Sequence, residues 1–141
     1  MIQVVLDTNI LASGAVAPAG GTLATIVDSW QAGLFGVVLS APILGELERT
    51  LGDPYFARRL SAQDVATYLT MVRSTASITP LTVQVKGIAT HPEDDLLLAT
   101  ALSGKVDYLV TGDSKLQRLG SYQGVCIVSP RQYVAILQSR G

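Results

Sequence analysis

The sequence predicts an α/β fold in which helices cover both faces of a parallel sheet. Short and nearly continuous apolar runs end abruptly at polar residues, as strands do when both faces of their sheet are buried. Segments with an apolar stripe at helical spacing lie between those runs, and strands that alternate with helices build parallel sheets. The four runs are residues 2–6, 36–39, 107–111 and 125–128.

The helices are expected in the intervening segments. Residues 22–34 carry one apolar stripe, and Gly33 or Gly36 can end that helix. Ser40 is a candidate N-cap for the next helix, which has Pro42 in its first turn. These features predict one helix before the run at residues 36–39 and another directly after it.

The later helices have their own start signals. Ser61 and Asp64 predict a variant of the capping box. Another helix begins at His91, and its body, residues 96–102, is apolar nearly all round and therefore expected to be buried. Ser129 is expected to cap the last helix. Loops are expected at residues 14–21 and 52–54.

The composition limits the class of protein. A chain of 141 residues with 48% apolar and 15% charged residues fits one domain over residues 1–141 and excludes a disordered tail. One cysteine and one histidine exclude a disulfide framework and leave too few ligands for zinc, and Cys126 is expected to be a buried, inert thiol. No uncharged apolar stretch reaches the roughly 20 residues of a bilayer span. We therefore expect a cytoplasmic protein with no membrane partner.

Acidic residues stand at the expected ends of two strands. Asp7 directly follows the first run, and Asp113 follows the run at 107–111. Ligands of an open parallel sheet bind at the carboxyl ends of the strands, where the strand order reverses. If these two strands flank that point, the two carboxylates are neighbours.

Three further acids are expected near the same edge of the sheet. Glu46 lies about two turns into the helix that follows the second run. Asp94 and Asp95 open a later helix, which points to this edge if a strand at residues 77–85 precedes it. Each acid also has a simpler explanation as a cap, a turn residue or a solvent-facing side chain. Their placement at matching ends of separate elements favours a shared site.

Such a site predicts a divalent metal ion. Carboxylates that converge without Lys or Arg between them repel one another unless a cation compensates their charge. Ligation by oxygen alone favours Mg²⁺ or Mn²⁺, and these ions activate water and stabilise the leaving oxygen of a phosphodiester. The residues therefore predict a metal-dependent nuclease.

Four motifs follow one another along nearly the whole chain: residues 6–9 (LDTN), Glu46, residues 92–101 (PEDDLLLATA) and residues 107–113 (DYLVTGD). Together they resemble the PIN-domain ribonucleases, and most closely the small single-domain toxin components of toxin–antitoxin pairs. The resemblance implies a three-layer α/β/α fold with parallel strand order 3-2-1-4-5. It also implies Mg²⁺- or Mn²⁺-dependent endonucleolytic cleavage of RNA.

The resemblance further implies an acidic quartet supported by two polar residues. The quartet is Asp7, Glu46, Asp94 and Asp113, and the supporting pair is Asn9 and Thr111. Asp95 stays an alternative metal ligand to Asp94, because neighbouring helical residues point about 100° apart. His91 is expected to be an N-cap or loop residue rather than a general base. A cognate antitoxin and a homodimer are the partners that the resemblance implies.

Basic residues at two places are candidates for RNA contacts. Tyr55 with Arg58 and Arg59 predicts either an RNA groove or a dimer contact. Lys115 and Arg118 lie near Asp113 and either hold a phosphate or form a solvated helix face. The chain has eleven acidic and ten basic residues. Without the four acids of the quartet, seven acids stand against ten bases, so the surface outside the site is expected to be mildly basic despite the net charge of −1.

Two other functions remain open. A receiver-type regulatory module also clusters acids around Mg²⁺, with one Asp phosphorylated. Receiver domains place an acidic pair after the first strand, whereas this chain has only Asp7 there. A PIN-fold protein that binds RNA without cutting it is the other alternative.

Overall fold

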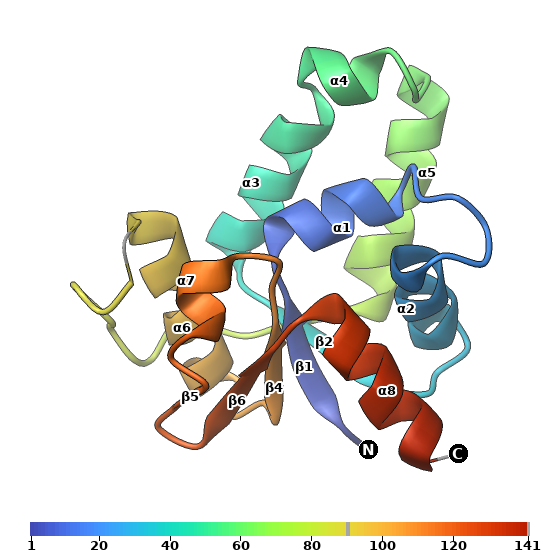
Figure 1. Cartoon of the computed structure of the whole chain (residues 1–141). Coiled ribbons are helices and arrows are strands. Elements are labelled where there is room, and N and C mark those ends of the chain that lie inside the picture. Colours follow the sequence, from blue (N-terminus) through green and yellow to red (C-terminus); the bar gives the residue numbers. More distant parts are fainter. Residues whose placement is uncertain (90, 141) are drawn as a thin grey trace.

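A six-stranded sheet forms the centre of the protein, with the strands in the order β3-β2-β1-β4-β6-β5. The computed structural model describes residues 1–89 and 91–140, and Figure 1 shows the sheet with the helices around it. The strands are β1 (Gln3–Leu6), β2 (Gly36–Leu39), β3 (Ser77–Ile78), β4 (Tyr108–Val110), β5 (Ser121–Tyr122) and β6 (Val125–Val128).

The predicted strand order is confirmed for the five strands expected from the sequence, and β5 is an addition. All neighbouring pairs are parallel except β5 and β6, so the sheet is mixed rather than fully parallel. Gln123 and Gly124 join β5 to β6 and both have positive φ angles, of 47° and 91°. Two residues of positive φ form the tight turn that matches the twist of an antiparallel hairpin. β5 is too short to be recognised from its apolar pattern.

Eight helices surround the sheet in the described part of the chain. They are α1 (Thr8–Gly14), α2 (Thr22–Gln31), α3 (Ala41–Leu51), α4 (Pro54–Ala57), α5 (Ala62–Thr75), α6 (Pro92–Ser103), α7 (Ser114–Gln117) and α8 (Pro130–Arg140). All five helices expected from the sequence are present. The short helices α1, α4 and α7 were not expected, and α1 and α4 occupy parts of the predicted loops. Gly33, with φ of 79°, ends α2 as predicted.

The three predicted cap residues all stand directly before their helices, and two of them cap the helix with the side chain. The hydroxyl group of Ser61 and the carboxylate of Asp64 each accept a hydrogen bond from the other residue's backbone N–H group, at 3.0 Å. Ser129 accepts from the backbone N–H group of Gln132 at 3.1 Å. Ser40 occupies the N-cap position of α3 as predicted, but its hydroxyl group makes no cap hydrogen bond and pairs with Thr100 instead.

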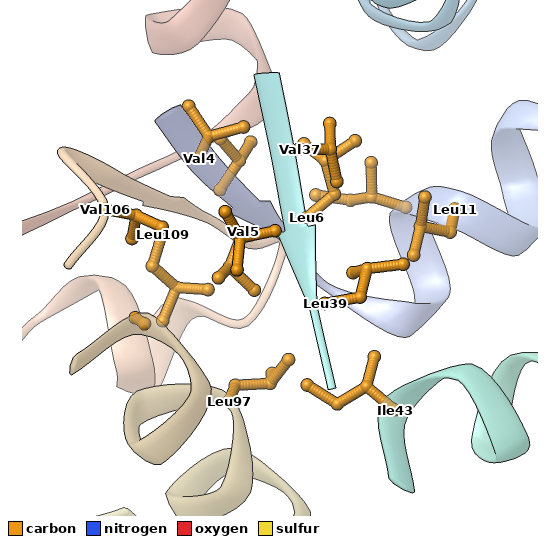
Figure 2. Close-up of a cluster of buried hydrophobic side chains, with 14 of the residues drawn as sticks. Val4, Val5, Leu6, Leu11, Val37, Leu39, Ile43, Leu97, Val106 and Leu109 are labelled. Atoms are coloured by element: carbon orange, nitrogen blue, oxygen red, sulfur yellow. The ribbon is translucent and has the colours of Figure 1, made fainter. Parts of the chain in front are cut away.

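The core lies on both faces of β1, as expected for a central strand. Val5 pairs in register with Leu109 of β4, and Figure 2 shows both on the side of Leu97, which belongs to α6. Leu6 faces the opposite layer, where Leu11 of α1 lies. All these side chains are at most 4% exposed. The sheet is therefore held between two helical layers, as the three-layer prediction requires.

Two expectations are corrected at the sides of the sheet. The strand predicted at residues 77–85 is reduced to Ser77–Ile78, because the chain after it leaves the sheet. Cys126 is exposed rather than buried, because only the face of β6 that carries Val125 and Ile127 is covered. No helix in the described residues is long and apolar enough to cross a membrane.

Candidate active site

Two carboxylates leave adjacent strands at the same edge of the sheet. Leu6 at the end of β1 pairs with Val110 at the end of β4, and the backbone N–H group of Asp7 continues the pairing to the carbonyl of Val110 at 3.0 Å. Asp113 follows β4 by three residues. The reversal of strand order on either side of β1 thus brings Asp7 and Asp113 to one place, as the sequence predicted.

Thr111 connects these two acids. Its hydroxyl group donates to Oδ2 of Asp7 at 2.7 Å and accepts from the backbone N–H group of Asp113 at 3.1 Å. Thr111 is fully buried, and Gln117 of α7 donates from Nε2 to its carbonyl oxygen at 2.7 Å. A buried side chain with all its polar atoms bonded is fixed in one rotamer, so Thr111 fixes the position of the Asp7 carboxylate.

Both acids also cap helices, as the simpler explanation required. Oδ1 of Asp7 accepts from the backbone N–H group of Asn9 at 2.7 Å, and Oδ1 of Asp113 accepts from Lys115 and Leu116 at 2.7 and 3.1 Å. The two explanations are compatible, because a carboxylate has about four acceptor positions and these bonds use only some of them. Asn9 contributes its backbone, and its exposed side chain lines the cavity described below.

Asp94 and Asp95 have different environments at the start of α6. The Asp95 carboxylate is 8% exposed and accepts three backbone N–H bonds, from Gly87 at 2.8 Å, Ile88 at 3.2 Å and Ala89 at 2.7 Å. Asp95 therefore holds the preceding loop. Burial and the charges of Asp113 and Asp7 raise the pKa of Asp94 above its ordinary value. Asp94 therefore interacts electrostatically with Asp113 and Asp7.

A cavity of about 1030 Å³ lies at this edge of the sheet, and the proposed quartet lines it. Asp7, Glu46, Asp94 and Asp113 all contribute to its wall, whereas Asp95 does not. Among the residues that sequence reasoning did not place here are Thr8, Arg49, His91 and Glu93. For His91, the available signal was its position just before the PEDD motif. The charge of His91 partly offsets the rise in the pKa of Asp94.

Glu46 is brought to the cavity by α3, and a buried contact holds the start of that helix. The hydroxyl groups of Ser40 and Thr100 lie 2.8 Å apart, and both residues are fully buried. This bond joins the β2–α3 junction to α6, and so connects the helices that carry Glu46 and Asp94. Glu46 itself forms a 2.8 Å salt bridge with Arg49, and their side chains are 43% and 70% exposed. Such an exposed pair contributes little to stability.

The candidate RNA-contacting residues lie outside this cavity in the described structure. Tyr55 is on α4, Arg58 and Arg59 follow it, and the guanidinium carbon of Arg59 lies 3.7 Å from the centre of the Tyr55 ring. Lys115 is exposed on α7, where its backbone N–H group caps onto Asp113. The structure therefore separates the acids of the cavity from Tyr55, Arg58 and Arg59 at α4, while Lys115 lies on α7 beside Asp113.

The chemistry of the cavity fits a hard divalent cation. The carboxylates of the quartet line the cavity, and burial followed by the charges of Asp113 and Asp7 raises the pKa of Asp94, so its charged form would be stabilised by a bound cation. Among residues 1–89 and 91–140, no three His, Cys, Asp or Glu side chains already form a group arranged to hold a metal ion. The donor types therefore fit Mg²⁺ or Mn²⁺, and binding would require the carboxylates to move closer together.

Comparison with known families agrees with this geometry. A family model described as the PIN domain matches residues 3–115, a range that contains the whole acidic quartet. The chain belongs to the PIN-domain family. PIN domains are generally nucleases, so membership supports a hydrolase at the level of the family. Among curated proteins, none matches this PIN domain in sequence.

Two solved structures share the fold of this PIN domain. A chain in the crystal structure of VapBC2 from Rickettsia felis, bound to a DNA fragment from their promoter, aligns with a TM-score of 0.62 and 16% identity, covering 91% of this chain and 98% of that chain. PAE2754 from Pyrobaculum aerophilum aligns with a TM-score of 0.64 and 17% identity, covering 98% of this chain and 90% of that one. At these identities the likeness shows the fold.

The strand order also separates this PIN domain from receiver modules. Receiver domains have the order 2-1-3-4-5, in which the first strand lies between the second and third. Here β1 lies between β2 and β4. The receiver alternative therefore loses its structural basis.

Proposed function

We propose that this PIN domain is a Mg²⁺- or Mn²⁺-dependent endoribonuclease. The observation that carries the proposal is that Asp7, Asp94 and Asp113 line one cavity, in which burial and then the charges of Asp113 and Asp7 raise the pKa of Asp94. Carboxylates in this arrangement either take up protons or bind a cation. A divalent ion bound in the cavity would compensate the charge of the carboxylates that line it.

Asp7, Glu46, Asp94 and Asp113 are the residues that would hold the metal. When bound, a divalent ion supplies an activated water for attack on phosphorus and neutralises the developing charge on the leaving oxygen. Thr111 acts behind them by fixing the carboxylate of Asp7. Residues that orient a ligand in this way strengthen metal binding without touching the ion.

Arg49 supplies the positive charge that competes with the metal. Its guanidinium lies 2.8 Å from Oε2 of Glu46 at the cavity wall. A cation held by Glu46 would compete with this pair, and the guanidinium of Arg49 would then be available to hold a phosphate oxygen of the substrate. Arginine is well suited to this exchange because its planar donors match carboxylate and phosphate equally.

RNA is proposed as the substrate from the resemblance to the PIN-domain ribonucleases and from the charge balance. Ten basic residues face seven acidic ones outside the quartet, so the remaining surface is mildly basic. Bound divalent ions would also make the cavity attractive to phosphate. Cleavage by an activated water leaves a 5′-phosphate and a 3′-hydroxyl group, as in the family that the sequence resembles.

A toxin role with a separate antitoxin is proposed for the whole protein. It is supported by the resemblance to small single-domain toxins and by the shared fold with a chain of VapBC2. An antitoxin that places an arginine among the carboxylates would neutralise them and block the cavity. We also propose a cytoplasmic homodimer, and exposed apolar side chains such as Leu81, Val83 and Ile88 support the dimer.

The proposal is tested by incubating the protein with single-stranded RNA in Mn²⁺, beside the variants Asp7→Asn and Asp28→Asn. Asp28 is an exposed acid on α2 outside the cavity and serves as the matched control. We expect the wild type and Asp28→Asn to cleave and Asp7→Asn to lose cleavage. RNA binding without cleavage by the wild type would support the non-cleaving alternative. Retained cleavage in Asp7→Asn would overturn the assignment of the site.

A further inference from the structure

A second hollow adjoins the acidic cavity on the side of α4. It has a volume of about 310 Å³ and a mostly apolar wall that includes Val16, Pro18, Thr22 and Tyr55. Ser13 of α1 and Leu23 of α2 line both this hollow and the acidic cavity. The two spaces are therefore neighbours along one surface, with α1 and α2 forming the boundary between them. In Figure 1, α4 lies at the top of the molecule above α1.

Tyr55 offers a preformed aromatic surface at this hollow. The side chain is 52% exposed, and Phe56, which is 9% exposed, packs edge-on against it with ring centroids 4.9 Å apart. The guanidinium of Arg59 lies over the ring and is held there by a 2.7 Å bond from Nη1 to the Tyr55 carbonyl oxygen. The ring therefore needs little ordering when a ligand binds, which favours affinity.

Positive charge at the same corner suits a phosphate chain. Arg58 and Arg59 are both exposed beside Tyr55, and Arg49 lies at the wall of the neighbouring acidic cavity. Bases stack on aromatic rings and arginine planes whatever their sequence, while nearby arginines neutralise the backbone. The hollow matches these requirements. It is apolar, an aromatic ring and arginines lie beside it, and it adjoins the cavity that holds the proposed metal ligands.

We infer that the hollow lined by Val16, Thr22 and Tyr55 is a subsite for one unstacked nucleobase of a single-stranded RNA whose neighbouring phosphate lies in the acidic cavity. The inference rests on the proposed ribonuclease function and narrows the substrate to RNA with an unpaired nucleotide next to the cleavage point. A base inside a duplex cannot enter such a hollow, because it is stacked and paired on its own strand.

The test measures binding of a short, labelled single-stranded RNA by fluorescence anisotropy, in EDTA and in Ca²⁺. A matched series of RNAs carries one abasic nucleotide at each position in turn. The protein variants are Tyr55→Ala, Tyr55→Phe and, as a control, Leu34→Ala, which removes an exposed apolar side chain at the turn before β2. Circular dichroism melts check that each variant is folded.

We expect Tyr55→Ala to weaken binding about fivefold or more, and Tyr55→Phe and Leu34→Ala to bind like the wild type. One abasic position should weaken binding by the wild type and have no further effect on Tyr55→Ala, since the same contact is lost in both. Equal abasic effects in both proteins would overturn the subsite, and so would a wild type that binds no single-stranded RNA. The binding assay does not depend on cleavage. If one abasic position weakens the wild type but not Tyr55→Ala, and the protein never cuts RNA, the subsite stands and only the nuclease function is rejected.

Discussion

The hydroxyl group of Thr111 donates a 2.7 Å hydrogen bond to the carboxylate of Asp7, although the two residues are 104 positions apart in the sequence. The same hydroxyl oxygen accepts from the backbone N–H group of Asp113. One buried side chain thus sets the spacing between the two acids that follow β1 and β4. The contact exists because these strands are parallel neighbours at the reversal of the strand order.

Replacing Thr111 by Val keeps the shape of the side chain and removes this connection. The variant leaves a buried acceptor and a buried donor without their partner, so we expect the free energy of unfolding to fall by about 1–3 kcal/mol. Cleavage by the folded protein should fall about 10–100-fold, as for other residues that orient metal ligands. Urea denaturation and RNA cleavage in Mn²⁺ measure the two effects. Thr111→Ser should restore much of both, and Thr70→Val on the exposed face of α5 should change neither.

Asp94→Asn and Asp95→Asn should have opposite profiles. Asp95 accepts three backbone N–H bonds from the loop before α6, so its amide variant should lose about 1–3 kcal/mol of stability while the folded fraction still cleaves. Asp94 lies beside two other acids, so its amide variant should be no less stable than the wild type and should lose cleavage. Parallel urea titrations and cleavage assays distinguish them. If Asp95→Asn were stable and inactive, Asp95 rather than Asp94 would be the acid required for cleavage.

The raised pKa of Asp94 predicts how stability depends on pH. The folded state binds this proton more tightly than the unfolded chain, whose Asp pKa is about 3.9. The resulting stabilisation is fully present below about pH 3.9 and is lost as the pH rises through the raised pKa of the folded protein. In EDTA, the wild type should therefore lose stability relative to Asp94→Asn as the pH increases from about 4. A difference between the two proteins that stays constant with pH would contradict this prediction.

Metal binding should stabilise the fold through the acidic quartet. A ligand that binds only the native state adds about 2.7 kcal/mol when its free concentration is a hundred times its dissociation constant. We expect Mn²⁺ to raise the melting temperature of the wild type and of Asp28→Asn, and to have little effect on Asp7→Asn or Asp113→Asn. Thermal melts with and without EDTA make the comparison. An equal response in all four proteins would place the metal elsewhere.

Much of this architecture could be predicted from the chain because the signals are local. Apolar runs that stop at polar residues identified β1, β2, β4 and β6, and the start signals at Ser61 and Ser129 identified α5 and α8. The short elements α1, α4, α7 and β5 were missed, because segments of two to seven residues hold too little periodicity to distinguish a helix or strand from a turn. Cys126 was misjudged for a related reason, since an apolar run does not reveal that one face of a strand is uncovered.

The chain alone identified the candidate acids, because carboxylates at the ends of separate elements are visible in the sequence. The choice between Asp94 and Asp95 as the acid that faces the cavity needed the folded structure, in which Asp94 lines the cavity and Asp95 does not. Adjacent residues on a helix differ in the side of the helix they occupy, and that side depends on how α6 packs against the sheet. The tertiary structure also showed that the hydroxyl group of Ser40 bonds to Thr100 rather than to the backbone of its own helix, and that Arg49 pairs with Glu46. The partner of a polar side chain depends on which elements meet, and a contact across 60 residues leaves no local pattern.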